Sequence, residues 1–293
     1  MNSKRHGKEL AREYYDQETK NYLQMYEKEY AGYPADLIRF QTIILKRLKN
    51  LKVKTVLDAG CGSCWPMREL LKNGFEVKGF DFSEKMIDEG KKVLANSGFD
   101  PDLISVGDIE KDSSLPKKRF DSAIALGIFT HLLDQKKALI NINKRLKSNG
   151  KALVQFRNDL FDSFTLNNYS YDFFLHSLID IGKFPNAIRK DISDFYLKKL
   201  VIQNTSKKST RKVSYNDVLA RFSNPLTIED ELFKPCGFRL DKIHFYHYHA
   251  LPPVFESKYP DLFKKMSISA ESPNSWKGYF MASAFVVEAT KLK

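Results

Sequence analysis

The sequence predicts a doubly wound, Rossmann-like α/β fold built on a seven-stranded sheet. From residue 53 to 157, short β-rich runs alternate with helical segments, which is typical of a parallel sheet covered by helices on both faces. A glycine-rich turn follows the first run, and an acidic residue stands at the end of each of the first three. These observations place a ligand site at the carboxyl ends of the strands.

Seven runs are predicted to be strands, and three segments between them are predicted to be helices. The strands are Val53 to Asp58, Phe75 to Asp81, Leu103 to Val106, Phe120 to Leu126, Lys151 to Phe156, Phe238 to His247 and Tyr279 to Glu288. The helices are Trp65 to Lys72, Ser83 to Ser97 and Leu133 to Lys147, the last two followed by Gly98 and by Asn149-Gly150 as stop signals. Right-handed crossovers bring the carboxyl ends of the parallel strands to one edge.

The length of 293 residues and the apolar content of 42% indicate one domain that carries insertions. Residues 1–50 are predicted to form a helical lid, because tyrosines recur there at loosely helical spacing ahead of the first strand. The tyrosines are Tyr14, Tyr15, Tyr22, Tyr26 and Tyr30. Residues 51–157 form the predicted core, 158–235 a helical and aromatic insertion over the strand edge after the fifth strand, and 236–293 the final two strands.

Composition argues against a membrane protein and a secreted one. The sequence has no run of about 18 apolar residues, and no apolar stretch follows the positive charges near its N-terminus. We therefore expect neither a membrane span nor a signal peptide, and a cytoplasmic location.

The cysteines Cys61, Cys64 and Cys236 are too few for a disulfide framework. Cys61 and Cys64 form a C-x-x-C pair, but no second pair or paired histidine follows at zinc-finger spacing. Free, buried thiols and no metal site are the prediction.

The formal net charge of +12 would favour anionic partners such as nucleic acid. Most of the basic residues are lysines that are spread along the chain rather than clustered with aromatics. Such a pattern is also typical of solvated helix faces, so the charge leaves the partner open.

The glycine-rich turn reads Asp58-Ala-Gly60-Cys61-Gly62-Ser63. Glycines there let the backbone approach a ligand closely. A dinucleotide site would have a third glycine at the helix start, where Trp65 stands instead. Asp58 would also repel a pyrophosphate but attract a cation. The turn therefore favours a cationic adenosyl ligand without phosphates.

Two further acids stand at neighbouring strand ends. Asp81 lies 19 residues after Gly62 (81 − 62) and could accept both hydroxyls of a ribose, although such aspartates are also common helix caps. Asp108, in Val106-Gly107-Asp108-Ile109, could accept the exocyclic amine of an adenine. Three acids at the ends of three successive strands are more specific than any one of them.

These motifs, VLDAGCGS, GFDFS and VGDIE, resemble those of class I S-adenosylmethionine (SAM)-dependent methyltransferases over about residues 53–157. The resemblance implies SAM as cofactor, with Asp81 on the ribose, Asp108 and Ile109 at the adenine, and Leu126 and Gly127 at the methionine end. The predicted cofactor-binding residues are Tyr15, Asp58, Gly60, Cys61, Gly62, Asp81, Phe82, Met86, Asp108, Ile109, Leu126 and Gly127. Cys64 departs from the family, many of whose members have a third glycine there.

Methyl transfer to oxygen or nitrogen calls for a group that removes the acceptor's proton. The candidates are His131, after the fourth strand, and His247 and His249, at the end of the sixth. His131 could instead cap the following helix. His247 and His249 are expected to share a strand face with Phe245. They lack a nearby carboxylate for a metal.

The leading functional prediction is methyl transfer to a hydroxyl, or an amine, of a small molecule such as a sugar or glycan precursor. Three segments around Phe156, Asn224 and His247 resemble bacterial methyltransferases of cell-surface glycan modification. The acceptor is expected under the 158–235 insertion, where aromatic residues offer stacking surface: Tyr169, Tyr171, Phe173 and Phe174.

Two alternatives stay open. One is an RNA methyltransferase, which the charge favours, although the Asn-Pro-Pro-Tyr type of tetrad is missing after the fourth strand. The other is a SAM-binding protein without catalysis. The sequence predicts no particular oligomeric state.

Overall fold

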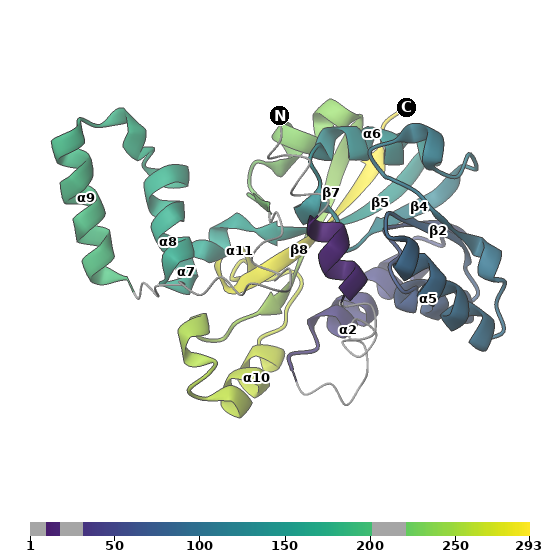
Figure 1. The fold of residues 1–293 in the computed structure, drawn as a ribbon, viewed down its shortest axis with the longest axis horizontal. Helices are drawn as coiled ribbons and strands as arrows, with labels where there is room; N and C mark the ends of the chain where they lie inside the picture. Colours follow the sequence, from purple (N-terminus) through teal and green to yellow (C-terminus); the bar gives the residue numbers. More distant parts are fainter. Residues whose placement is uncertain (1–9, 18–31, 201–220) are drawn as a thin grey trace.

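The computed structural model of the protein describes residues 10–17, 32–200 and 221–293 (Figure 1). Its centre is a mixed sheet in the strand order β3-β2-β1-β4-β5-β8-β7, with the short β6 paired to β5. The strands are β1 Thr55–Ala59, β2 Glu76–Asp81, β3 Ile104–Val106, β4 Phe120–Ala125, β5 Leu146–Asn158, β6 Phe222–Ser223, β7 Phe238–Tyr248 and β8 Ala282–Lys291. The predicted doubly wound α/β class is confirmed, with β6 as an eighth strand that the pattern did not indicate.

Strand direction fixes where the functional edge lies. Strands β1, β2, β3, β4 and β5 are parallel, whereas β8 runs antiparallel to both β5 and β7. Strand β7 therefore points the same way as β5. The carboxyl ends of β1, β2, β4, β5 and β7 meet at one edge of the sheet, which is where such sheets bind ligands.

Both faces of the sheet are buried, because successive residues of a strand point to opposite faces and pack in two separate cores. Val56 and Ile124 belong to one core, and their neighbours Leu57 and Ala123 belong to the other. The first core is covered by α2 Ala35–Arg39, η1 Phe40–Leu45, α3 Lys46–Asn50, α4 Trp65–Lys72 and α5 Glu84–Asn96. The second is covered by α6 Gln135–Arg145 and η9 Glu229–Phe233.

Local capping sets where two of the predicted helices begin. The Ser83 hydroxyl accepts a hydrogen bond from the Met86 N–H at 3.0 Å, which starts α5. A carboxylate oxygen of Asp134 likewise accepts from the Lys137 N–H at 2.9 Å and starts α6. Each cap satisfies a backbone donor that the helix leaves unpaired.

Two predicted boundaries are wrong. Strand β5 begins at Leu146, inside the segment predicted to be helix, because α6 already ends at Arg145. Strand β8 begins at Ala282 rather than Tyr279, because Gly278–Met281 form the short helix α11. The Asn158 side-chain amide donates to the carbonyl oxygens of Gly278, Tyr279 and Ala282, which holds that turn in place.

The insertion after β5 differs from the expectation. Its helices α7 Asp162–Thr165, α8 Asn168–Asp172 and α9 Asn186–Lys199 lead outward, and α8 and α9 extend away from the sheet in Figure 1. Helix α9 has no buried residue, so it has no face that packs on the sheet edge. The insertion returns to the sheet as β6, where the Arg221 N–H donates to the Thr130 carbonyl oxygen at 2.8 Å.

A second insertion separates β7 from β8. Residues 249–281 contain η11 Pro253–Phe255, α10 Pro260–Ser269 and α11 instead of a tight turn. This stretch falls within residues 236–293, which were predicted to form the final two strands. The connection leaves and rejoins the sheet at the carboxyl end of β7, beside the functional edge.

The described helices do not suit a membrane span. Within residues 10–17, 32–200 and 221–293, none combines the length and the apolar character needed to cross a bilayer.

A buried ion pair joins the N-terminal helices to the last strand. Glu288 on β8 is 2% exposed and accepts two hydrogen bonds from the Arg47 guanidinium, at 2.7 and 2.8 Å. His244 on β7 lies 3.0 Å from the same carboxylate. Burial opposes ionisation of Glu288, but the contacts with His244 and Arg47 outweigh it and lower its pKa to about 2.

We predict that Glu288→Gln lowers the free energy of unfolding by about 2 kcal/mol, because it removes the charge from hydrogen bonds to a buried group. A pKa held below its ordinary 4.5 stabilises the fold above that pH, and the contribution disappears as the pH falls towards 2. Urea denaturation at pH 7 measures the loss. The exposed ion pair of Lys234 and Asp230 supplies the control, since Lys234→Ala should change the midpoint little. Equal stability of Glu288→Gln and the unaltered protein would contradict the prediction.

Candidate active site

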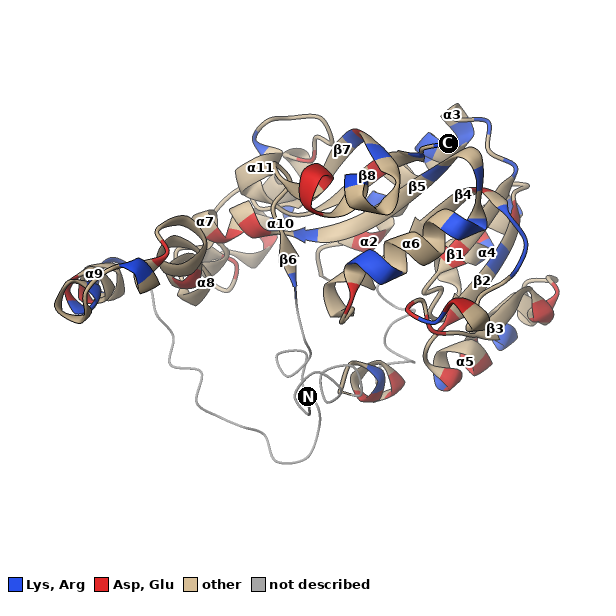
Figure 2. Cartoon of the chain, turned by 90° about the horizontal axis from the view of Figure 1, so that it is seen from above, with Lys and Arg blue, Asp and Glu red and all other residues tan. Residues whose placement is uncertain are grey.

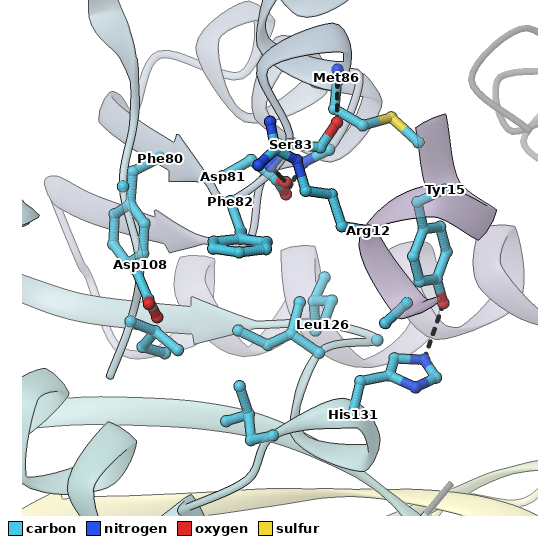
Figure 3. Close-up of a pocket in the computed structure, with 18 residues that line it drawn as sticks. Arg12, Tyr15, Phe80, Asp81, Phe82, Ser83, Met86, Asp108, Leu126 and His131 are labelled. Carbon is cyan, nitrogen blue, oxygen red and sulfur yellow. Dashed lines mark hydrogen bonds between the residues drawn. The ribbon is translucent and has the colours of Figure 1, made fainter. Parts of the chain in front are cut away.

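A pocket opens at the carboxyl ends of β1, β2 and β4 (Figure 3). It is lined by Ala11, Arg12, Tyr15, Gly60, Gly62, Phe80, Asp81, Phe82, Ser83, Met86, Gly107, Asp108, Ile109, Leu126, Gly127, Ile128, His131 and Leu132. Ten of the twelve residues predicted to bind the cofactor are in this set, and Asp58 and Cys61 are not. The pocket therefore brings together residues from four strand ends and from the N-terminal segment.

The glycine turn needs its glycines. Gly60 and Gly62 have φ values of +80° and +52°, a region that side chains disfavour. A Cβ at Gly60 would lie 2.3 Å from Cγ2 of Ile128. The N–H groups of Gly60 and Cys61 both donate to the Phe80 carbonyl oxygen, at 2.8 and 3.0 Å, which joins the turn to β2. The turn is thereby held against the pocket wall.

Cys64 occupies the position of the family's third glycine with a left-handed backbone, at φ +67°. Its thiol packs so closely on α5 that a Cβ at Gly90 would lie 2.6 Å from Sγ. Cys61 points away from the pocket against Gly79, and the neighbouring Cys64 thiol and burial raise the pKa of Cys61 well above its ordinary value. Cys61, Cys64 and Cys236 are free and buried, as predicted.

Asp81 joins the first two strand ends. One carboxylate oxygen accepts the Gly62 N–H and the other accepts the Ser83 N–H, both at 2.9 Å. Burial raises the pKa of Asp81, although these hydrogen bonds oppose the shift. A carboxylate can accept about four hydrogen bonds, so these backbone contacts do not exhaust Asp81, and its bond to the ribose stays a prediction.

Asp58 lies behind the turn and is the most strongly desolvated of the three acids. It is 1% exposed, and its Oδ2 has no hydrogen-bond partner among the described residues. Burial, with the nearby Asp81 charge, raises the pKa of Asp58 to about 7, and Arg39 opposes the shift. A buried carboxylate of this kind is stabilised by a cation and destabilised by a phosphate. The site therefore fits a cationic cofactor such as SAM.

Asp108 lies at the other end of the pocket from His131 in Figure 3. It is 7% exposed, and its carboxylate accepts the Glu110 N–H at 3.0 Å. The Ser114 hydroxyl accepts the Asp108 N–H at 3.0 Å and fixes the loop. Asp108 is thus positioned, with Ile109, to contact an adenine.

The helical segment 10–17 covers the pocket. The Arg12 guanidinium lies 5.5 Å from the centre of the Phe82 ring, and the Ser83 hydroxyl donates to Asp16. Tyr15 reaches across to His131, with its hydroxyl 2.8 Å from Nε2 (Figure 3). The segment lies over the pocket, and its role as a lid stays a prediction. The predicted tyrosines 22, 26 and 30 lie outside the described residues.

His131 ends the short helix Phe129–His131 and is 8% exposed. The next helix is capped by Asp134, so the alternative that His131 caps it is wrong. Its ring lies edge-on to Tyr15, with centroids 5.5 Å apart. Of the three histidines predicted as bases, His131 lines the pocket.

His247 and His249 lie elsewhere along the same edge. Strand β7 is three strands from β4 in the sheet order, or about 14 Å. The two rings are 4.9 Å apart, as expected for residues on one face. The prediction that they share a face with Phe245 is wrong. His247 has φ +61°, and this left-handed residue interrupts the alternation of side chains between the two faces of the strand. Tyr248 therefore packs in the same core as Phe245.

Burial also changes the chemistry of these two histidines. It lowers the pKa of His247 to about 4, with Arg157 and Arg39 adding to the effect, and that of His249 to about 3, with His247 adding to it. Both rings are therefore neutral and weakly basic near pH 7. The expectation of an unperturbed histidine base is wrong for them.

Comparison with known proteins agrees with the fold and the pocket. Residues 57–154 match the model of a methyltransferase domain family. Together with the glycine turn and the strand-end acids, this match supports a SAM-dependent methyltransferase domain of class I over residues 57–154. SAM is the cofactor of that class, and the residues of this pocket fit it.

The chain is similar to two curated proteins over part of its length. An uncharacterized protein of Haemophilus influenzae is 33% identical over 45% of this chain and 54% of its own length. A ubiquinone biosynthesis O-methyltransferase of Coxiella burnetii is 28% identical over 71% of this chain and 73% of its own. The match therefore spans about half of the first relative. Magnesium protoporphyrin IX methyltransferase of Synechocystis, solved with bound SAH, shares the fold with a TM-score of 0.55 at 14% identity, over 97% of this chain and 99% of that one.

The described residues contain no cluster of three histidine, cysteine, aspartate or glutamate side chains that could hold a metal.

Some residues that line the pocket were not predicted from the sequence. Arg12, on the lid segment, and Ile128, against the glycine turn, line the pocket without having been predicted. Neither carries a motif, because their roles come from packing that only the folded chain reveals.

We predict that Asp81→Ala weakens binding of S-adenosylhomocysteine by about 30- to 150-fold, the loss expected for hydrogen bonds to a charged group worth about 2 to 3 kcal/mol. Calorimetry measures the affinity, and thermal unfolding checks that the variant is folded. Asp102→Ala, at an exposed carboxylate away from the pocket, is the control and should bind normally. Unchanged affinity in a folded Asp81→Ala variant would remove Asp81 from the cofactor site.

We also predict that SAM binding releases protons near pH 7. The free protein holds Asp58 partly protonated, because its pKa is about 7, and a bound cation lowers that pKa. Affinity should therefore rise as the pH increases from 6 to 8 and then level off. Calorimetry in two buffers of different ionisation enthalpy counts the protons, and Asp58→Asn should remove both the release and the pH dependence. A pH-independent affinity in the unaltered protein would contradict this assignment.

Proposed function

We propose that the protein transfers a methyl group from SAM to a hydroxyl of a small molecule, such as a sugar or glycan precursor, with an amine acceptor as a variant. The observation that carries the proposal is the hydrogen bond between Tyr15 and His131 at the end of the pocket opposite Asp108. A proton-accepting pair at this end of the pocket supports transfer to an oxygen acceptor, which must lose its proton. The similarity to an O-methyltransferase of Coxiella burnetii supports the same reaction class.

The chain's own residues would bind and orient the reactants. Asp81 and Asp108 hold the ribose and adenine, and the desolvated Asp58 favours the positive charge of the methyl donor. The cofactor supplies an activated methyl group when bound. In-line transfer needs little covalent help, so positioning and water exclusion by segment 10–17 supply much of the rate.

Proton removal falls to Tyr15 and His131. The Tyr15 hydroxyl can donate to His131 Nε2 at 2.8 Å. A proton that leaves the acceptor hydroxyl for the Tyr15 oxygen can therefore pass on to the imidazole. Such a pair can act as the general base of the transfer. His247 and His249 are not assigned this role, since burial makes both weak bases.

RNA is the second candidate acceptor, and the net charge of +12 favours it. Figure 2 shows basic and acidic residues interspersed along α5 and α9, whereas α6 carries basic residues only. An RNA-binding surface would concentrate lysine and arginine against the phosphates. The mixed charges of α5 and α9 favour the small acceptor.

We predict that Tyr15→Phe and His131→Gln each lower kcat by about 100-fold or more, because each breaks the proton path. Binding of S-adenosylhomocysteine should change far less. His176→Gln, at an exposed histidine, is the matched control and should retain full activity. Methyl transfer from labelled SAM to a panel of neutral sugars, amino sugars and phenols measures the rates. Full activity in both variants would contradict the assigned pair.

The same assay separates the two acceptors. Phosphate contacts would make RNA methylation fall about 10³-fold or more between 50 and 200 mM salt. The proposal expects turnover on a small hydroxylated molecule with little dependence on salt. Activity on bulk RNA with a steep loss over that range, and none on the panel, would overturn it.

A further inference from the structure

Two buried polar groups near the carboxyl end of β7 have no hydrogen-bond partner among the described residues. They are the ring of His249, at both Nδ1 and Nε2, and Oε2 of Glu271. Leaving a buried polar atom unpaired costs about 1 to 3 kcal/mol, so such groups call for an explanation. Both belong to the 249–281 connection, and the cofactor pocket does not include them.

Both groups are held in place by their neighbours. The Tyr33 hydroxyl and the Tyr248 N–H donate to Oε1 of Glu271, the latter at 3.0 Å, which leaves Oε2 as the remaining acceptor. The His249 N–H donates to the Met281 carbonyl oxygen at 2.8 Å and anchors its backbone. The orphan atoms are therefore fixed in direction, as the polar groups of a binding site are.

Aromatic rings surround the same groups. The His249 ring lies 4.7 Å from Phe161 and 5.5 Å from Phe263, measured between centroids. His247 lies beside it and stacks on Tyr33 at 4.8 Å with an interplanar angle of 26°. Four segments contribute to this cluster: the stretch before α2, the short helix η5 Asp159–Phe161 after β5, the end of β7, and α10. Flat apolar surfaces of this kind suit a ring-shaped ligand.

The charges of the cluster limit what that ligand can be. Neutral His249 offers one N–H donor and one acceptor nitrogen, which a hydroxyl can satisfy because it both donates and accepts. The Glu271 carboxylate accepts hydrogen bonds and repels anions. Burial raises the pKa of Glu271, while the bonds from Tyr33 and Tyr248 lower it. His249 and Glu271 carry no positive charge that would bind a phosphate or carboxylate group, and the nearby cations Arg157 and Arg39 act on the adjacent His247. A neutral group with several hydroxyls finds matching partners on His249 and Glu271.

The position of the cluster suits the second substrate of the enzyme. Strand β7 ends at the same edge as β1 and β4, so His249 and the cofactor pocket lie along the same edge of the sheet. His247 and His249 are half-buried residues, but both ring nitrogens of His249 are buried. Helix α10 buries only Phe263 and Ser267, so the inference requires that a small shift of α10 uncovers these nitrogens.

We infer that His249 and Glu271, flanked by Phe161 and Phe263, bind an uncharged, hydroxylated ring of the methyl acceptor. The inference rests on the proposed function and narrows its substrate class. It assigns acceptor recognition to the connection between β7 and β8 rather than to α8 and α9.

The test is histidine NMR on the full chain, labelled with ¹³C in the histidine rings and saturated with S-adenosylhomocysteine. The His249 resonance is assigned with His249→Gln. Methyl β-glucoside and catechol are the neutral probes, and glucose 6-phosphate is the anionic one. Either neutral probe should shift the His249 resonance in a saturable way, leave His244 and His176 unmoved, and outcompete the anionic probe.

Glu271→Gln should weaken binding of the neutral probe by about tenfold or more, since it removes a charged acceptor. Glu256→Gln, at an exposed acid of the same connection, is the matched control and should bind normally. Absence of a His249 shift with both neutral probes, or equal binding in Glu271→Gln, would overturn the inference. Methyl transfer without a shift of the His249 resonance would refute this binding site but not the proposed function. A shift of the His249 resonance without methyl transfer to any acceptor would count against the proposed function.

Discussion

The geometry of the active site depends on the carboxylate of Asp81. Its two oxygens accept the N–H groups of Gly62 and Ser83, so one side chain fixes the glycine turn after β1 and the start of α5 after β2. The turn can lie this close to β2 because Gly60 and Gly62 adopt left-handed backbone conformations. The Ser83 hydroxyl then caps α5 and contacts Asp16 of the covering segment. Cofactor pocket, helix and lid segment therefore share one anchor.

Desolvation gives this edge of the sheet its selectivity. It raises the pKa of Asp58 and so prepares a carboxylate that gains from a nearby cation, and it lowers the pKa of His247 and His249 and so keeps them neutral. Desolvation thus suits the end of the edge near Asp58 to a sulfonium cofactor. At the other end, near His247 and His249, it suits the inferred site to an uncharged acceptor. His131 is in contact with Tyr15. In the proposed mechanism it accepts the proton that the acceptor hydroxyl loses.

Most of the fold could be predicted because strand periodicity, helix caps and the spacing from Gly62 to Asp81 are local signals. Ten of the twelve predicted cofactor residues line the pocket, because the carboxyl ends of parallel strands converge whatever the loops do. The contacts that could not be predicted are non-local: Tyr33 meets Glu271 from the far end of the chain, and β6 pairs with β5 across a long insertion. The left-handed backbone at His247 also changed which side chains share a face, and alternation alone cannot reveal such a break.

The central claim is that strand-end acids select a cationic, phosphate-free adenosyl ligand. Calorimetry of the intact protein with SAM and with NAD tests it most directly, because the two ligands share adenosine and differ in charge. The account predicts saturable binding of SAM at one site per chain and no measurable binding of NAD. Tight binding of NAD without binding of SAM would contradict it.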